Sequence, residues 1–117
     1  MKENIVKNKS FDFALRIVKL SKHLTETKRE FVLSKQLLRS GTAIGALVRE
    51  SEQAENKADF IHKLSISLKE ANETDYWLDL LYKSDYLKRE EYESIKTDID
   101  ETLKLLLSII KTSKANK

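Results

Sequence analysis

Few residues in this chain could carry acid–base or metal chemistry. The 117 residues include two histidines and no cysteine, which excludes thiol catalysis, disulfides and cysteine metal sites. A di-iron helical bundle needs paired Glu-x-x-His elements, and neither His23 nor His62 has a glutamate three residues before it. The sequence offers no Ser-His-acid set and no glycine-rich phosphate loop. We therefore expect no catalytic residue, no metal and no cofactor.

One pair of residues keeps an enzymatic alternative open. Arg16 and His23 lie seven positions apart, so a helix places them on the same exposed face. Their spacing resembles the Arg-x(4 to 6)-His motif with which a helical nuclease family cleaves RNA. An RNase that uses Arg16 and His23 is one interpretation, and a surface pair without a catalytic role is the other.

Basic side chains point to a different chemistry, the binding of phosphates. The net charge is +3, and the first 29 residues alone carry +5. Helical periodicity places these cations in stripes on the exposed arcs of the first two helices, and such stripes could lie along a phosphate backbone. The alternatives are an ordinary solvated face, or ion pairs between Arg39 or Arg49 and acids of a neighbouring helix. The candidate nucleic-acid-binding residues are Arg16, Lys19, Lys35, Arg39 and Arg49.

The elements that must position these residues are helices. The chain has no proline and only two glycines, and its apolar residues recur every three to four positions, which predicts an all-α protein. Short polar breaks predict four helices, joined by short turns in one antiparallel, up-down-up-down four-helix bundle over residues 1–117. No stretch is typical of a signal peptide or a membrane helix, so we expect a cytoplasmic protein. The predicted helices span about 6–27, 31–53, 57–84 and 89–111.

Two features predict a subunit interface. Gly41 and Gly45 lie four apart within a helical pattern, where each glycine lowers helix stability by about 1 kcal/mol relative to alanine. We expect the close approach of a neighbouring helix to compensate for this loss. The apolar arc of the first helix covers roughly 220°, about twice what a surface helix of a monomer needs. Either this helix is central to one bundle or the excess arc contacts another subunit, and we favour the second interpretation. The predicted interface residues are Phe11, Leu15, Gly41, Gly45, Ile66 and Trp77.

A carboxylate interrupts the apolar seam of the third helix. Asp75 falls between residues that the periodicity turns toward the core, and a charge there is costly unless it has a partner. We expect a structural ion pair with Arg39 or Arg49 rather than a catalytic acid.

Two segments carry a family resemblance. The run Leu-Leu-Arg-Ser-Gly-Thr-Ala-Ile-Gly from Leu37 and the acidic Asp-Tyr-Trp-Leu-Asp from Asp75 are similar to those of the four-helix-bundle proteins called 23S rRNA intervening-sequence proteins. The resemblance extends nearly end to end. It implies an up-down bundle that assembles into a ring-like homopentamer, and it supplies no catalytic residues. The family is also similar to the accessory variability proteins of diversity-generating retroelements, which form a basic pentameric barrel that binds nucleic acid and a reverse transcriptase.

Together these observations predict a non-enzymatic, homo-oligomeric bundle, pentameric on the strength of the resemblance, that acts as a nucleic-acid-associated or scaffolding protein. Five copies of a chain with net charge +3 would carry +15 and would repeat the basic stripes around a ring. The alternative is a protein–protein interaction module whose partner docks on the ring without nucleic acid.

Overall fold

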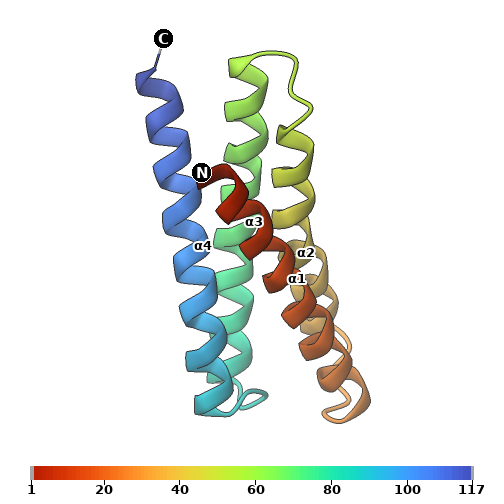
Figure 1. Ribbon diagram of the computed structural model, residues 1–117. Coiled ribbons are helices and arrows are strands. Elements are labelled where there is room, and N and C mark those ends of the chain that lie inside the picture. The colour runs from red at the N-terminus through yellow and green to blue at the C-terminus, as the bar shows by residue number, and fades with distance from the viewer. Residues whose placement is uncertain (1, 117) are drawn as a thin grey trace.

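Four antiparallel helices make up the computed structural model, which describes residues 2–116 (Figure 1). The predicted all-α, up-down-up-down bundle is confirmed. The α1–α2 and α3–α4 connections lie at one end of the bundle, and the α2–α3 connection lies at the other (Figure 1). Each helix contacts the next along the chain, and α1 also contacts α4. The helices are α1 (Lys2–Glu26), α2 (Leu33–Ser51), α3 (Lys57–Lys83) and α4 (Arg89–Ala115).

The helix boundaries differ from the predicted ones mainly at the outer ends. The first helix begins at Lys2 rather than near residue 6, and the fourth continues to Ala115 rather than ending near 111. Contacts between these two ends explain the extensions, because the Lys2 ammonium donates to Ser108 Oγ at 2.6 Å and Val6 is buried. The second helix begins at Leu33 rather than at residue 31, because the side chain of Glu30 caps it.

Local hydrogen bonds fix the starts of the other helices. Asn56 is the N-cap of α3, and its side chain accepts from the backbone N–H of Asp59 at 2.8 Å. At the start of α4 the backbone N–H of Lys88 donates to Glu91 Oε1 at 3.0 Å. These caps satisfy amide groups that the helices themselves leave unpaired.

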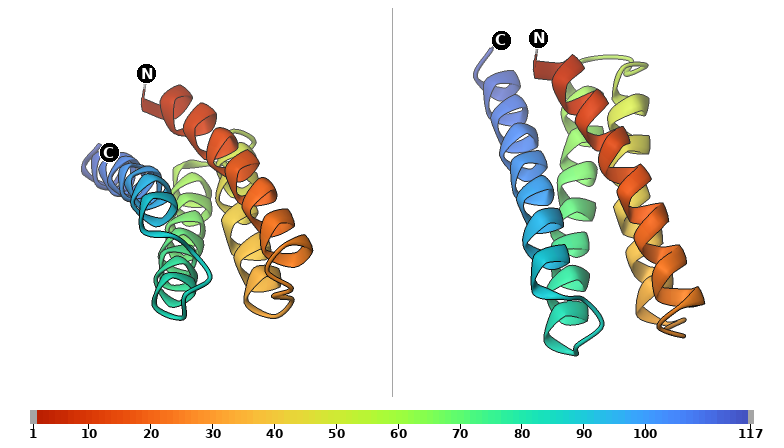
Figure 2. Two further views of the ribbon diagram at one scale, coloured as in Figure 1. Left: turned by 90° about the horizontal axis from the view of Figure 1, so that it is seen from below. Right: turned by 60° about the horizontal axis from the view of Figure 1, so that its bottom comes forward.

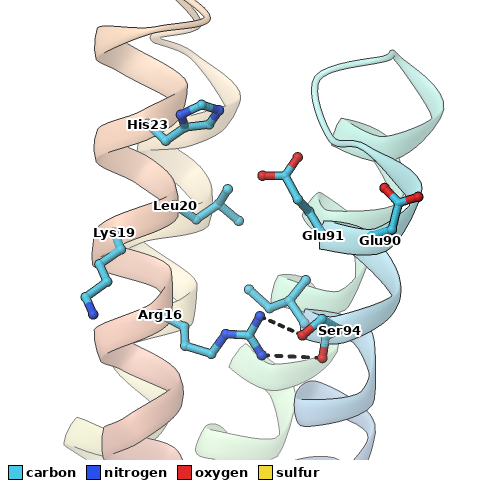
Figure 3. Close-up of a pocket in the computed structure, with 8 residues that line it drawn as sticks. Arg16, Lys19, Leu20, His23, Glu90, Glu91 and Ser94 are labelled. Atoms are coloured by element: carbon cyan, nitrogen blue, oxygen red, sulfur yellow. Dashed lines mark hydrogen bonds between the residues drawn. The ribbon is translucent and has the colours of Figure 1, made fainter.

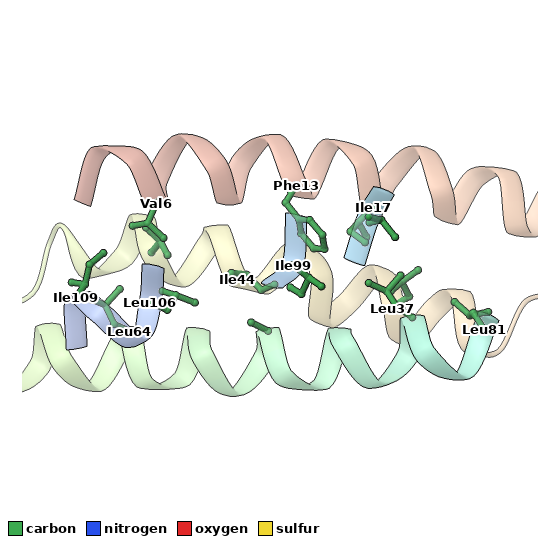
Figure 4. Packing of buried hydrophobic residues seen from close by; sticks show 14 of the residues in the cluster. Val6, Phe13, Ile17, Leu37, Ile44, Leu64, Leu81, Ile99, Leu106 and Ile109 are labelled. Carbon is green, nitrogen blue, oxygen red and sulfur yellow. The ribbon is translucent and has the colours of Figure 1, made fainter. Parts of the chain in front are cut away.

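One apolar core runs the length of the bundle (Figure 4). Phe13 and Ile17 of α1 face Ile44 of α2 and Ile99 of α4, and each of the four is at most 1% exposed. Small polar residues bridge α2 and α3 within it. The fully buried core side chains with the largest volumes are Phe13, Ile17, Leu24, Leu37, Ile44, Leu64, Leu78, Leu81, Ile99, Leu106, Val6 and Thr74.

The two glycines allow α1 and α2 to approach closely. A Cβ atom placed on Gly41 would lie 2.8 Å from Ile17 Cγ1 and 2.9 Å from Ile17 Cγ2. A Cβ on Gly45 would lie 3.2 Å from the carbonyl oxygen of Ser10, an atom of the α1 backbone. The predicted close approach is thus present, but within one chain. Gly41 is buried against α1 of the same chain, and its role as a subunit contact stays a prediction.

The helix α1 diverges from α4 along the bundle. The two lie close together near the start of α1 and separate toward the α1–α2 connection, as both views in Figure 2 show. Over the same length α1 stays on α2. The divergence leaves a hollow between α1 and α4 that is lined by polar side chains.

Candidate nucleic-acid interface

The guanidinium of Arg16 is engaged within the chain. Its Nη1 lies 2.6 Å from Asp98 Oδ2 on α4. Its Nη2 donates to Ser94 Oγ, on the same helix, at 3.0 Å (Figure 3). These bonds tie α1 to α4 where the two helices diverge. Arg16 is therefore occupied by structural contacts.

The predicted pair of Arg16 and His23 lines the hollow between α1 and α4. The hollow measures about 620 Å³, and Glu90 and Glu91 form its opposite wall (Figure 3). With Arg16 already bonded to α4, His23 is the only member of the predicted pair that is available to a substrate. Two carboxylates beside it disfavour a polyanion. The geometry gives little support to an RNase site here.

Arg39 forms ion pairs with the neighbouring helix α3. Its guanidinium contacts Glu73 directly and reaches Glu70 Oε1 at 3.2 Å. The indole N–H of Trp77 donates to the same Glu73 at 2.9 Å, so the carboxylate joins an arginine of α2 to an aromatic residue of α3. The interpretation of Arg39 as an ion-paired residue is confirmed.

Arg49 instead lies over an aromatic ring. Its guanidinium carbon is 5.6 Å from the centre of the Phe11 ring on α1, within the range of a cation–π contact. The Arg49 side chain also lines a groove of about 510 Å³ whose floor includes Gly45 and Ala46. Arg49 is exposed and forms no ion pair with another described residue.

The predicted partner of Asp75 is wrong. Asp75 pairs with Lys96 of α4 rather than with Arg39 or Arg49, because it lies on the side of α3 that faces α4. Lys96 also lies 3.7 Å from Asp79 Oδ1, which accepts a hydrogen bond from the Tyr92 hydroxyl at 2.5 Å. Burial acts to lower the pKa of Lys96, but the bond to Asp75 and the nearby carboxylates raise it overall. The cluster is a charged contact between α3 and α4.

Five exposed cations gather around the α1–α2 connection at one end of the molecule. Lys19 and Lys35, both predicted candidates, are exposed and form no ion pair with another described residue. The same holds for three cations that the sequence analysis did not nominate. A signal for them was present, since Lys28 and Arg29 stand together in a break between two apolar patterns. We call this set the basic end: Lys19, Lys22, Lys28, Arg29 and Lys35.

A buried carboxylate holds the backbone of the basic end in place. The side chain of Glu30 accepts from the N–H groups of Val32, Leu33 and Ser34 at 3.2, 3.0 and 2.7 Å. Burial acts to raise the pKa of Glu30, but these three backbone bonds and the Ser34 hydroxyl lower it overall. Because the carboxylate is bound to the first amides of α2, it offers little negative charge to a ligand outside.

An apolar strip runs along the outer face of α1. Phe11, Leu15 and Val18 are 49%, 48% and 48% exposed, at helical spacing. This exposure fits the predicted excess apolar arc, while a contact with another subunit stays a prediction. The other predicted interface residues are less exposed, since Ile66 and Trp77 are both half-buried and Trp77 packs against the core.

No group of three or more His, Asp or Glu side chains in the described part of the chain could hold a metal ion. Among residues 2–116, no helix is both long enough and apolar enough to cross a membrane.

The fold and the charges define the class of this protein: a helical bundle with ion pairs between its helices and a basic end. The model of the 23S rRNA-intervening sequence protein family matches residues 2–108, and the chain belongs to this family. A crystal structure of a Bacteroides thetaiotaomicron protein of unknown function from the S23 ribosomal protein family is similar, with 62% identity and a TM-score of 0.94. The match covers 95% of this chain and 99% of that one. No curated protein matches the chain.

Family membership confirms the resemblance to the intervening-sequence proteins. The similarity to the accessory proteins of diversity-generating retroelements stays a prediction, as do the oligomeric state and the binding of nucleic acid.

Proposed function

We propose that this protein is a non-enzymatic, cytoplasmic homo-oligomer that binds nucleic acid through its basic end. One observation carries the proposal. Five exposed cations lie on the last turns of α1, the α1–α2 connection and the start of α2, and none is neutralised by an ion pair within the described chain. Arg16 and Arg39, by contrast, are engaged by carboxylates. The residues proposed for phosphate contact therefore change from the predicted stripes to this end.

A single basic end would bind weakly, so the proposal includes assembly. Non-specific binding to phosphates depends on the number of contacts made together, and repeating five cations around an oligomer multiplies that number. The resemblance described above suggests five copies.

The apolar strip supports association between copies. Three apolar side chains in a row, each about half exposed, form a patch of the kind that marks interaction sites. An apolar surface that could receive it lies on α3, where Tyr76 is 58% exposed and its ring packs edge-on against the half-buried Trp77. We propose that the strip of one copy packs on this region of α3 in the next.

The assembly is tested by the solution mass. Leu15→Glu places a charge in the centre of the strip, and light scattering should show a smaller particle than for the wild type. Leu107→Glu is the matched control, because Leu107 is a 54% exposed leucine on α4, away from the strip. Equal masses for wild type and Leu15→Glu would exclude the strip as the interface.

Binding is tested with a charge-matched pair of variants. Lys22, Lys28 and Lys35 are changed to glutamine in one protein, and Lys104, Lys111 and Lys114 of α4 in the other. Both lose three exposed positive charges, but only the first set belongs to the basic end. In fluorescence anisotropy with labelled RNA at about 50 mM salt, the first variant should bind at least tenfold more weakly than the second. Equal loss in both would show that net charge alone attracts the RNA.

A scaffolding role without nucleic acid is the second candidate, and the same apolar strip favours it. A strip of exposed apolar side chains fits a protein partner as well as another copy. Capture of a defined protein partner that survives loss of the basic end would support this candidate.

A further inference from the structure

The α1–α2 connection exposes an aromatic side chain in the middle of the basic end. Phe31 is 53% exposed and Val32 is 71% exposed, although both follow directly on a buried glutamate. The guanidinium carbon of Arg29 lies 5.1 Å from the centre of the Phe31 ring. An exposed aromatic ring in cation–π contact with a guanidinium, in a segment that also carries Lys28 and Lys35, combines a flat apolar surface with positive charge.

We propose that Arg29 and Phe31 form a stacking platform for an unpaired base, so that the basic end binds single-stranded nucleic acid in preference to a duplex. This inference rests on the proposed function and names its ligand class. Unpaired bases stack on aromatic side chains and on guanidinium planes, while cations beside them hold the phosphates. A duplex buries the faces of its bases, so it can contact the basic end only through its phosphates, which bind the cations.

The connection is rigid enough to present the platform without large ordering on binding. The backbone N–H of Glu30 donates to the carbonyl of Leu24 at 2.9 Å, and the Ser34 hydroxyl donates to the carbonyl of Glu30 at 2.8 Å. The Glu30 carboxylate also binds the amide of Val32. Hydrogen bonds on both sides of Phe31 thus hold the α1–α2 connection, which lies at the end of the bundle (Figures 1 and 2).

Charge is the argument for a nucleic acid rather than an apolar partner. The segment from Lys19 to Lys35 contains five cations and two carboxylates, and one of the two is Glu30, which binds backbone amides. A polyanion complements the positive charge of this segment, whereas an apolar protein surface would have to desolvate the cations around Phe31.

The test separates stacking from charge. Phe31→Leu keeps an apolar side chain and the net charge but removes the aromatic face, and Phe31→Trp keeps that face. Arg29→Lys keeps the charge but removes the planar guanidinium. Because Arg29 and Phe31 are both exposed, each of the three variants should keep the wild-type melting temperature. The ligands are labelled 12-nucleotide single strands of one unstructured sequence, as RNA and as DNA, and duplexes with the same number of phosphates.

The platform predicts that the wild type binds at least one of the single strands more tightly than its duplex. Phe31→Leu should lose about tenfold in affinity for that strand and less than twofold for the duplex. Arg29→Lys should also lose more affinity for the strand than for the duplex. Phe31→Trp should bind both ligands like the wild type. Equal affinity of wild type and Phe31→Leu for the strand would overturn the platform and leave the proposed function standing, provided that the wild type binds both ligands.

Two other outcomes also overturn the platform. If the wild type binds neither strand nor duplex, the proposed function fails with it. If Phe31→Leu lowers the solution mass in light scattering and leaves the affinity for the strand unchanged, Phe31 belongs to a contact between copies.

Discussion

Replacing Gly41 by alanine tests the close packing of α1 on α2. A methyl group at this position would lie 2.8 and 2.9 Å from the two γ-carbons of Ile17, whereas carbon atoms pack best at about 3.5–4.0 Å. Ile17 is fully buried, and a β-branched side chain in a helix has one strongly preferred χ1 rotamer, so it cannot easily turn away. Such overpacking costs about 1–3 kcal/mol, and the better helix propensity of alanine returns about 1 kcal/mol. We expect Gly41→Ala to lower the free energy of unfolding by up to about 2 kcal/mol.

A double-mutant cycle with Ile17 shows whether the steric argument is right. Ile17→Ala removes both γ-carbons and should itself cost about 2–5 kcal/mol. In that background the two closest carbon atoms are gone and only the Cβ of residue 17 remains, 3.3 Å from the new methyl group. Gly41→Ala should therefore be close to neutral, or stabilising by up to about 1 kcal/mol. The assay is urea unfolding followed by circular dichroism at one fixed protein concentration. If Gly41→Ala has the same effect in both backgrounds, or stabilises the wild type, the proposed contact is wrong.

Three further predictions concern single groups. Glu30→Gln should lower the free energy of unfolding by about 1–2 kcal/mol at pH 7, because the fold lowers the pKa of Glu30 and so favours its charged form. The difference between the two proteins should vanish as pH falls through the folded pKa and the wild-type carboxylate is protonated. A difference that does not depend on pH would contradict this. The hydrogen bond to Asp79, burial and the Asp79 charge raise the pKa of Tyr92 to about 12, so this bond stabilises the fold below about pH 10 and is lost as pH rises toward 12. Tyr92→Phe should therefore be less stable than the wild type at pH 8 by urea unfolding, and a constant gap up to pH 12 would refute the assignment. Purified wild type should leave labelled RNA intact over hours, and cleavage that His23→Ala abolishes would establish the RNase instead.

The fold was predictable because it depends on patterns within single helices. Apolar spacing and the absence of proline predicted four helices and their order, and the pair Gly41 and Gly45 predicted a close approach between two helices. These features follow from the period of the helix and from side-chain volume, which the sequence states directly.

The ion pairs were harder to predict because they depend on how helices face each other. Asp75 was expected to pair with an arginine of α2, but the rotation of α3 turns it toward Lys96 of α4. Arg16 looked like an exposed cation, yet Asp98 and Ser94 lie within its reach on α4. Sequence spacing gives the face of a residue on its own helix, and the partner across the contact requires the relative rotation and height of both helices.

The basic end was missed for a local reason. Glutamate is not among the usual N-cap residues, so Glu30 was not recognised as the cap that ends the connection before Leu33. The segment was taken partly as helix, and Phe31 was assigned to its first turn. Once Glu30 binds the first amides of α2, Phe31 and Val32 must lie outside the helix, among the cations of the connection.

The salt dependence of binding tests the central claim most directly. For the wild type and a labelled single strand, the logarithm of the association constant should fall with the logarithm of salt concentration with a slope of about −3.5 per protomer if all five cations of the basic end contact phosphates. Changing Lys22, Lys28 and Lys35 to glutamine should reduce this slope by about 2, and the matched α4 variant should leave it unchanged. The same slope for all three proteins, or no binding by the wild type at about 50 mM salt, would contradict the account.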